Sequence, residues 1–198
     1  MLKLEDYGTI FLLLSLAGAL AISTPALAVV VPTVASEKFS ELYILGPNRM
    51  AEDYPFNVKA NESYNVFLGI GNHIGSSSYY ALYVKLRSRD EPLPNSTVET
   101  PSPLPALYEY KVILSEGEVW EKPLSFSFNG LSFNENSCLV ETLTINGLKQ
   151  QVNKLVLWDP ENKGYYLELF FELWIYNSET NAFTFHNRFV GIWLNMTG

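Results

Sequence analysis

The sequence has few of the residues that build disulfide-bonded or metal-bound proteins. Its 198 residues include one cysteine, Cys138, and two histidines, His73 and His186. One cysteine cannot form an intramolecular disulfide, and these three residues show no spacing typical of zinc ligands. We therefore expect no metal and no cofactor. Cys138 is predicted to be a small buried side chain, and His73 a residue of a turn or strand edge.

Basic side chains are also scarce, and they occur singly. Lys and Arg number 13 against 21 Asp and Glu, which gives a formal net charge of −8. A surface that binds the phosphates of nucleic acid needs clustered Lys and Arg. The sequence therefore predicts no nucleic-acid partner.

Catalytic motifs are missing as well. Residues 76–78, three serines, are typical of a flexible turn rather than of a nucleophile elbow. Residues 69–71 lack the third glycine and the helix of a dinucleotide-binding loop, and indicate close backbone packing instead. Glu116 and Glu118 flank a glycine in a predicted turn, where solvated carboxylates are common. We expect no enzyme activity and no catalytic residue.

Charge is absent from the 30 residues between Asp6 and Glu37. The apolar part, residues 8–31, would form a helix about 36 Å long, because each residue adds about 1.5 Å, and a hydrocarbon core is about 30 Å thick. Residues 8–31 are therefore predicted to be a single transmembrane helix, kinked or ended by Pro25. It would follow a short tail, residues 1–7, and precede a linker, residues 32–38.

A cleaved signal peptide is the alternative for this segment. Residues 26–28, Ala-Leu-Ala, fit a cleavage site, which would lie after Ala28. The start fits poorly, since Lys3 is the only basic side chain before the apolar run and Glu5 and Asp6 follow it. We favour a retained anchor in the cell membrane. The short N-terminal tail and the large C-terminal part place the domain outside the cell, with the lipid bilayer as partner.

Residues 39–198 alternate between apolar and polar positions in short runs, which is typical of half-buried strands. About nine strands are expected, and residues 146–147, Asn-Gly, suit a tight hairpin. No three-turn amphipathic helix is predicted after Pro32. The prediction is a mainly β domain, an immunoglobulin-like antiparallel β-sandwich preceded by the single helix. Ten alternating runs support this estimate, at residues 39–45, 56–59, 64–72, 80–86, 108–114, 125–128, 139–145, 148–158, 164–176 and 183–194.

Two parts of this domain stand out. The last pair of strands is apolar on both faces and is predicted to be the centre of the sheet, with Phe171 in the core and Glu172 on the opposite face. Residues 90–105 hold five of the eleven prolines of the chain. Because proline removes a hydrogen-bond donor and stiffens the backbone, this segment is predicted to be a projecting loop.

Three sequons predict possible N-glycosylation, if the domain is exported. They begin at Asn95, Asn195 and Asn61, and we rank them in that order. Asn95 comes first because it lies in the proline-rich loop, where an enzyme reaches the backbone easily.

Residues 39–89 resemble a known family. The run contains LGP at 45–47, YP at 54–55, GIGNH at 69–73 and a tyrosine-rich strand from Tyr80 to Val84. These elements are similar to the extracytoplasmic part of an archaeal family of uncharacterised membrane proteins, domain of unknown function 1616. The resemblance implies a membrane-tethered, immunoglobulin-like domain outside the cell. It implies no activity and no functional residues.

The function expected from the sequence is a non-catalytic, membrane-anchored surface protein, an accessory or structural subunit that contacts other envelope or membrane proteins. One alternative is a homo-oligomer or filament subunit, in which residues 29–45, freed by cleavage after Ala28, add a strand to a neighbour. Another is a carbohydrate-binding module that uses exposed aromatic residues such as Trp120, Trp158 or Tyr165.

Overall fold

The chain folds as two compact units, residues 1–37 and residues 38–198, and the computed structural model describes residues 4–30 and 38–198. The first unit contains helix α1, Leu4–Val30. The helix takes up part of the expected tail, since it begins at Leu4, and it continues past Pro25 rather than ending there. Val31 and nearly all of the expected linker lie outside the described residues.

The predicted transmembrane segment is helical up to Val30. Among the described residues, however, no helix combines the length and the apolar character needed to cross a membrane. The helix is thus confirmed, but the structure lends no support to the prediction that it spans a bilayer.

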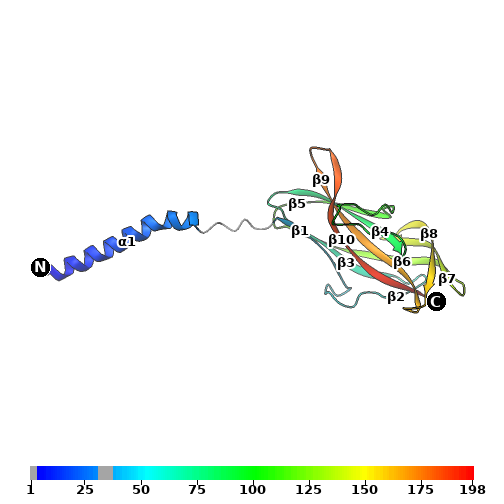
Figure 1. Ribbon diagram of the computed structural model, residues 1–198. Helices are drawn as coiled ribbons and strands as arrows, with labels where there is room; N and C mark the ends of the chain where they lie inside the picture. Colours follow the sequence, from blue (N-terminus) through cyan, green and yellow to red (C-terminus); the bar gives the residue numbers. More distant parts are fainter. Residues whose placement is uncertain (1–3, 31–37) are drawn as a thin grey trace. The chain divides into compact units, whose positions relative to one another are not determined.

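The second unit, the β-domain, is a strongly curled and mostly antiparallel sheet of ten strands (Figure 1). The strands are β1 Phe39–Leu45, β2 Asn57–Lys59, β3 Tyr64–His73, β4 Ser78–Ser88, β5 Tyr108–Leu114, β6 Val119–Phe133, β7 Ser137–Ile145, β8 Leu148–Asp159, β9 Gly164–Asn177 and β10 Ala182–Thr197. Their order is β1-β3-β6-β7-β8-β9-β10-β2, and β4 pairs with both β9 and β5. Between strands, the parallel pair recorded in the described β-domain is β10–β2.

The mainly β prediction is confirmed, but the sheet is continuous where a sandwich has two separate sheets. The junction is short: Trp158 pairs with Tyr165, and Asp159 with Gly164, in the hairpin from β8 to β9. Because strands twist, a sheet of this many strands curls until its two halves face each other. The core lies between these halves and draws residues from nearly every strand.

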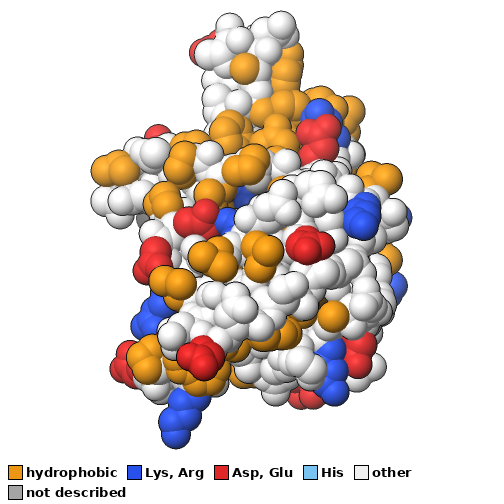
Figure 2. Space-filling model, turned by 90° about the vertical axis from the view of Figure 1, so that its right-hand side faces the viewer, with side chains coloured by type: hydrophobic (Ala, Val, Ile, Leu, Met, Phe, Trp, Pro, Cys, Tyr) orange, Lys and Arg blue, Asp and Glu red, His pale blue; other side chains and the backbone are white. Residues whose placement is uncertain are grey.

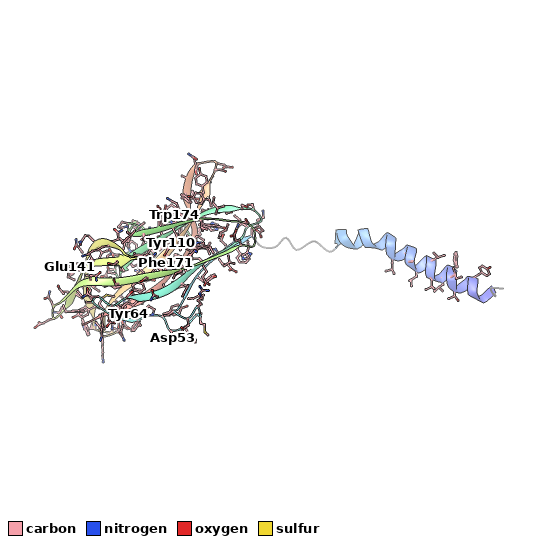
Figure 3. The ribbon with its side chains drawn as sticks, turned by 180° about the vertical axis from the view of Figure 1, so that it is seen from behind. Asp53, Tyr64, Tyr110, Glu141, Phe171 and Trp174 are labelled. Carbon is pink, nitrogen blue, oxygen red and sulfur yellow. The ribbon has the colours of Figure 1, made fainter. Side chains whose placement is uncertain are left out.

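The predicted central position is confirmed for β9 and wrong for β10, which lies at an edge because it pairs with β9 alone until residues 195–197 meet the short strand β2. Strand β9 pairs with β4 on one side and β10 on the other. Phe171 lies among the strands in Figure 3 and is fully buried with Leu169 and Leu173, as its alternation predicts. The bulge in β10 between Phe185 and Arg188 is a feature that alternation alone did not reveal.

Turn-forming residues explain why one hairpin is predicted correctly and strand β6 is predicted too short. The predicted hairpin forms, with φ of 48° at Asn146 and 82° at Gly147, the positive angles a tight turn needs. Strand β6 is much longer than residues 125–128, because Pro123 is accommodated within its pairing to β3 and Gly130, at φ 68°, lies within its pairing to β7 without a shift of register. Because a proline or a glycine normally marks the end of a strand, the predicted β6 is shorter than the observed one.

Candidate functional site

The proline-rich segment packs onto the sheet, and the prediction of a projecting loop is wrong for its second half. Ser102 is buried. Its backbone nitrogen donates to Glu172 Oε1 at 2.8 Å, and its carbonyl oxygen accepts from Lys85 Nζ at 2.7 Å. The segment is held down because it supplies hydrogen bonds to two charges that would otherwise be buried and incompletely partnered.

Those two charges form an ion pair on the face of β4 and β9 that points away from the core. Lys85 Nζ lies 2.8 Å from Glu172 Oε2, and their side chains are 5% and 0% exposed. Trp174 Nε1 also donates to Glu172 Oε2, at 3.2 Å. Glu172 therefore faces away from Phe171 as predicted, but it is buried rather than solvated.

A second buried ion pair continues this face. Arg87 Nε donates to Glu168 Oε2 at 2.6 Å across the β4–β9 pair. The guanidinium carbon lies 5.1 Å from the ring centre of Trp193 on β10, a cation–π contact. Glu168 extends over Gly191, where an added Cβ would come within 2.5 Å of its carboxylate. The two ion pairs and the rings beside them are tightly fitted structural groups.

A groove lies between β1 and β10, bordered by Gly191 and Trp193 of this face. Its volume is about 540 Å³, and it is mostly apolar. It is lined by Leu42, Tyr43, Ile44, Tyr54, Pro55, Phe56, Val190, Gly191, Ile192 and Trp193. A smaller hollow of about 190 Å³ shares Leu42 and Val190 with it, and adds Ser96 and Asn187–Phe189.

Both strands that border the groove present an unpaired edge to it. Within residues 38–198, β1 pairs with β3 alone, and β10 pairs with β9 alone until residues 195–197 meet β2. The outer edge is polar: Ile44 O accepts from Tyr54 OH at 2.8 Å, and Asn195 N donates to Phe56 O at 2.7 Å. The backbone groups of a strand point to alternate edges from one residue to the next. Leu42 is two residues from Ile44 and Gly191 is four residues from Asn195, so their backbone groups also point to the outer edges of β1 and β10.

One end of the groove is closed by a chain of buried polar groups. Ser40 Oγ lies 2.8 Å from Tyr80 OH and 2.9 Å from His186 Nε2. Tyr80 OH donates to Asn72 Oδ1 at 3.0 Å, and Asn72 Nδ2 donates to backbone oxygens including Leu114 O at 2.9 Å. The chain joins β1 directly to β10 through Ser40 and His186, and joins β1 to β4 and β3 through Tyr80 and Asn72.

Burial lowers the pKa of His186 below its ordinary value, and the positive charge of Arg188 lowers it further. The ring is therefore neutral at neutral pH. A serine next to a neutral histidine resembles a nucleophile and its base, but Ser40 is 0% exposed and also bonds to Tyr80. With no room for a substrate at its oxygen, this pair is an arrangement for holding strands together.

The residues expected to be structural are found in such positions. Cys138 is 0% exposed, and burial raises the pKa of its thiol to about 11. His73 ends β3 and stacks on Phe39 at 4.8 Å between ring centres. Gly69 lies under the ring of Tyr43, with no room for a Cβ, which confirms close packing at residues 69–71. Among the described residues, no group of three His, Cys, Asp or Glu side chains could hold a metal ion.

The three sequon asparagines differ in their surroundings. Asn95 and Asn61 are exposed. Asn195 is partly buried: its Nδ2 donates to Asn57 Oδ1 at 2.9 Å, and its Oδ1 accepts from Tyr165 N at 3.1 Å. N-glycosylation at these three positions stays a prediction from the sequence.

The aromatic residues expected to bind carbohydrate are not one patch. The rings of Trp158 and Tyr165 lie 5.0 Å apart at the β8–β9 hairpin. Trp120 instead packs on Tyr110, at 5.1 Å. A different set of aromatic residues, which alternation could not bring together, surrounds a pocket near Trp193.

Comparison with known proteins yields one family. The family model described as "Domain of unknown function (DUF1616)" matches residues 33–135. No curated protein matches the sequence.

Among solved structures, the β-glucosidase of Listeria innocua in complex with glucose aligns at 12% identity with a TM-score of 0.37. The same enzyme in complex with gluconolactone aligns at 14% identity with a TM-score of 0.34. Both alignments cover 82% of this chain, which spans 16% of the length of those chains. Likenesses of this size carry no argument about the activity of this chain.

Proposed function

This chain belongs to the family described as domain of unknown function DUF1616, and we propose that it is a non-catalytic, membrane-anchored protein that contacts another envelope protein through the groove between β1 and β10. The contact partner supplies an extended, apolar segment. The β-domain faces the outside of the cell, and an immunoglobulin-like sandwich is the fold type to which its two facing halves correspond best.

The observation that carries this proposal is the pair of unpaired strand edges beside an apolar groove. Exposed edges are templates for strand pairing, and proteins normally cover them or protect them with charge. At residues 42 and 190–193 no charged side chain protects the edge, since these positions hold Leu42, Val190, Gly191, Ile192 and Trp193. Strand addition to such an edge gives affinity through the backbone and specificity through side-chain pockets.

A buried hydrogen-bond acceptor beside the groove favours a partner segment that carries hydrogen-bond donors. Asn187, in the bulge of β10, lines the smaller hollow of the groove. Among the described residues, its Oδ1 is the buried side-chain atom without a hydrogen-bond partner. An N–H group of an added segment would satisfy it, which would recover the cost of leaving it unpaired.

Membrane anchorage rests on the sequence. The 30 uncharged residues before Glu37 suit lipid better than water, since a helix satisfies their backbone groups internally. Figure 2 shows one face of the β-domain on which hydrophobic side chains lie in small groups, with charged side chains of both signs between them.

Site-specific photo-crosslinking in native membranes tests the contact surface. A photoreactive residue at Leu42 or Val190 should give a discrete adduct in which the attached peptide is extended and apolar. The matched control is Ile113, which is 68% exposed on β5 and outside the groove. Adducts of equal yield from all three positions, or none from Leu42 and Val190, would refute the groove as the contact site.

The fold limits which residues could form the donated strand of a filament. Residues 39–45 are already β1 of their own sheet, paired with β3 through seven residues. A donated strand would therefore have to come from residues before Phe39, or β1 would have to exchange between copies. The crosslinking experiment separates these cases, since a homotypic adduct identifies a second copy as the partner.

A further inference from the structure

A pocket of about 430 Å³ lies next to the groove, on the far side of Phe56 and Trp193. Its volume is within the range of about 300–1,000 Å³ that is common for small-molecule sites. It is lined by Phe56, Arg89, Asp159, Asn162, Tyr166 and Trp193. These residues come from the segment before β2, the end of β4, the β8–β9 hairpin, β9 and β10, so the pocket exists only in the folded domain.

Aromatic rings form one side of the pocket. Phe56 is 49% exposed and Trp193 is 37% exposed, although both are large and apolar. The ring of Phe56 lies 6.0 Å from that of Tyr166. Three rings at one pocket, two of them left in water, indicate a ligand with an apolar surface to place on them.

The rings are held in position before any ligand binds. Tyr166 OH donates to Asn162 O at 2.7 Å. A Cβ on Gly164 would come within 2.7 Å of the Tyr166 ring, so glycine is required for the ring to lie there. On β10, Trp193 is contacted by the guanidinium of Arg87, which is itself fixed by Glu168. Such preorganisation lowers the entropy cost of binding.

Polar groups form the other side. The carboxylate of Asp159 is hydrogen-bonded to Arg89 and accepts from Asn162 Nδ2 at 2.7 Å. The Arg89 side chain is 57% exposed, and its Nη2 lies 4.0 Å from Glu161. A guanidinium has five N–H donors, so Arg89 retains donors for a ligand. One positive charge beside the two negative charges of Asp159 and Glu161 disfavours an anionic ligand.

We propose that this pocket binds a neutral pyranose sugar. The apolar C–H face of the ring packs on the aromatic side, Trp193 and Tyr166, and the hydroxyl edge meets Arg89, Asp159 and Asn162. A flat ligand with one apolar face and a rim of donors and acceptors matches both sides of the pocket. This inference does not rest on the partner contact at β1, although the pocket shares Phe56 and Trp193 with the groove.

The test uses the full chain in a detergent without a sugar headgroup, because such a headgroup would compete. Neutral hexoses and their short oligomers are titrated while tryptophan fluorescence and NMR shifts are followed. At least one sugar should bind saturably, in about the millimolar range expected for a ligand of this size. Failure of every neutral sugar to bind, or preference for an anionic sugar, would overturn the proposal.

Variants assign the binding to the pocket. Tyr166→Ala and Trp193→Ala should each weaken binding about tenfold or more, whereas Trp120→Ala, whose ring packs on Tyr110 away from the pocket, should leave it unchanged. Circular dichroism establishes that each variant is folded, and Arg89→Met, at a second and exposed position, should also weaken binding. Equal loss in Trp120→Ala would place the sugar elsewhere. Since Tyr166 does not line the groove, Tyr166→Ala should keep the crosslink at Val190, so the two proposals can fail separately.

Discussion

Glu172 has a different role from the one its position in the alternating pattern indicates. On β9 it points away from the core, where a carboxylate is normally solvated, yet its side chain is 0% exposed and bonded to Lys85 and Ser102. Removing one member of a buried ion pair leaves the other charge without compensation, which costs more than the pair contributes.

Glu172→Ala is accordingly expected to lower the free energy of unfolding by about 3–5 kcal/mol. Phe171→Ala should lower it by a similar amount, about 3–5 kcal/mol, through the cavity it leaves in the core. Urea unfolding of both variants measures this. The double variant Lys85→Met/Glu172→Leu should be more stable than Glu172→Ala alone. If Glu172→Ala were as stable as the natural chain, the pair would be solvated in solution.

His186 makes stability depend on pH. Burial and Arg188 lower the pKa of His186 in the folded domain, so between that value and the unfolded value of about 6.5 the unfolded chain binds more protons. Its contribution to stability is therefore present above about pH 6.5 and is lost as the pH falls through the folded pKa. The charged and titratable neighbours are Arg188 on the same strand and Tyr80 on β4, beside the uncharged Ser40 on β1.

Unfolding midpoints at about pH 7.5 and about pH 5.5 test this dependence. The natural chain should lose stability at the lower pH. His186→Gln keeps a hydrogen-bonding group near Ser40 but does not titrate, and should reduce that loss. His73→Gln removes the other histidine and serves as the control. An unchanged loss in His186→Gln would show that other groups are responsible.

At the scale of elements, the proline-rich loop and strand β10 differ in how accessible they leave the asparagine of a sequon. Asn95 lies in the first, exposed half of the proline-rich loop, where its Oδ1 accepts from Thr97 N at 2.9 Å. Asn195 lies in β10, and its side-chain amide contacts two neighbouring strands. Its Nδ2 donates to Asn57 of β2, and its Oδ1 accepts from the backbone nitrogen of Tyr165 on β9. Attaching a glycan to Asn195 Nδ2 would replace one of its two N–H donors and crowd the contact with Asn57.

We therefore predict that, in exported protein, Asn95 carries the most complete glycan and Asn195 the least, with exposed Asn61 between them. Mass spectrometry of peptides from native material, with site occupancy measured for each sequon, checks this order. Higher occupancy at Asn195 than at Asn95 would mean that modification precedes the pairing of β10 with β2.

At the scale of the whole molecule, the two compact units should differ in whether they attach to a membrane. Full-length protein should remain in the membrane fraction after a carbonate wash, because residues 7–36 carry no charge. A chain that begins at Lys38, the first residue of the second unit, should be soluble without detergent. Release of the full chain by carbonate would contradict anchorage. An N-terminus at Val29 in native protein would instead indicate cleavage after Ala28.

Local chemistry in the sequence determined a large part of the β-domain. Alternation predicts β1 and β5 with the bounds that the structure shows, and the Asn146–Gly147 turn forms because few residues adopt positive φ so readily. The burial of Phe171 and Cys138 also follows from sequence, since apolar side chains on one face of a strand have to leave water. These features depend on neighbours within a few residues.

Only the tertiary structure decided which polar faces are buried and where the sites lie. Lys85 and Glu172 are 87 positions apart in sequence, and their pairing depends on the register of β4 against β9 and on a loop folding over both. The groove likewise depends on which edge of the curled sheet faces β10. Alternation shows that a side chain points to one face or the other. What covers that face is set by long-range packing, which a single sequence does not specify.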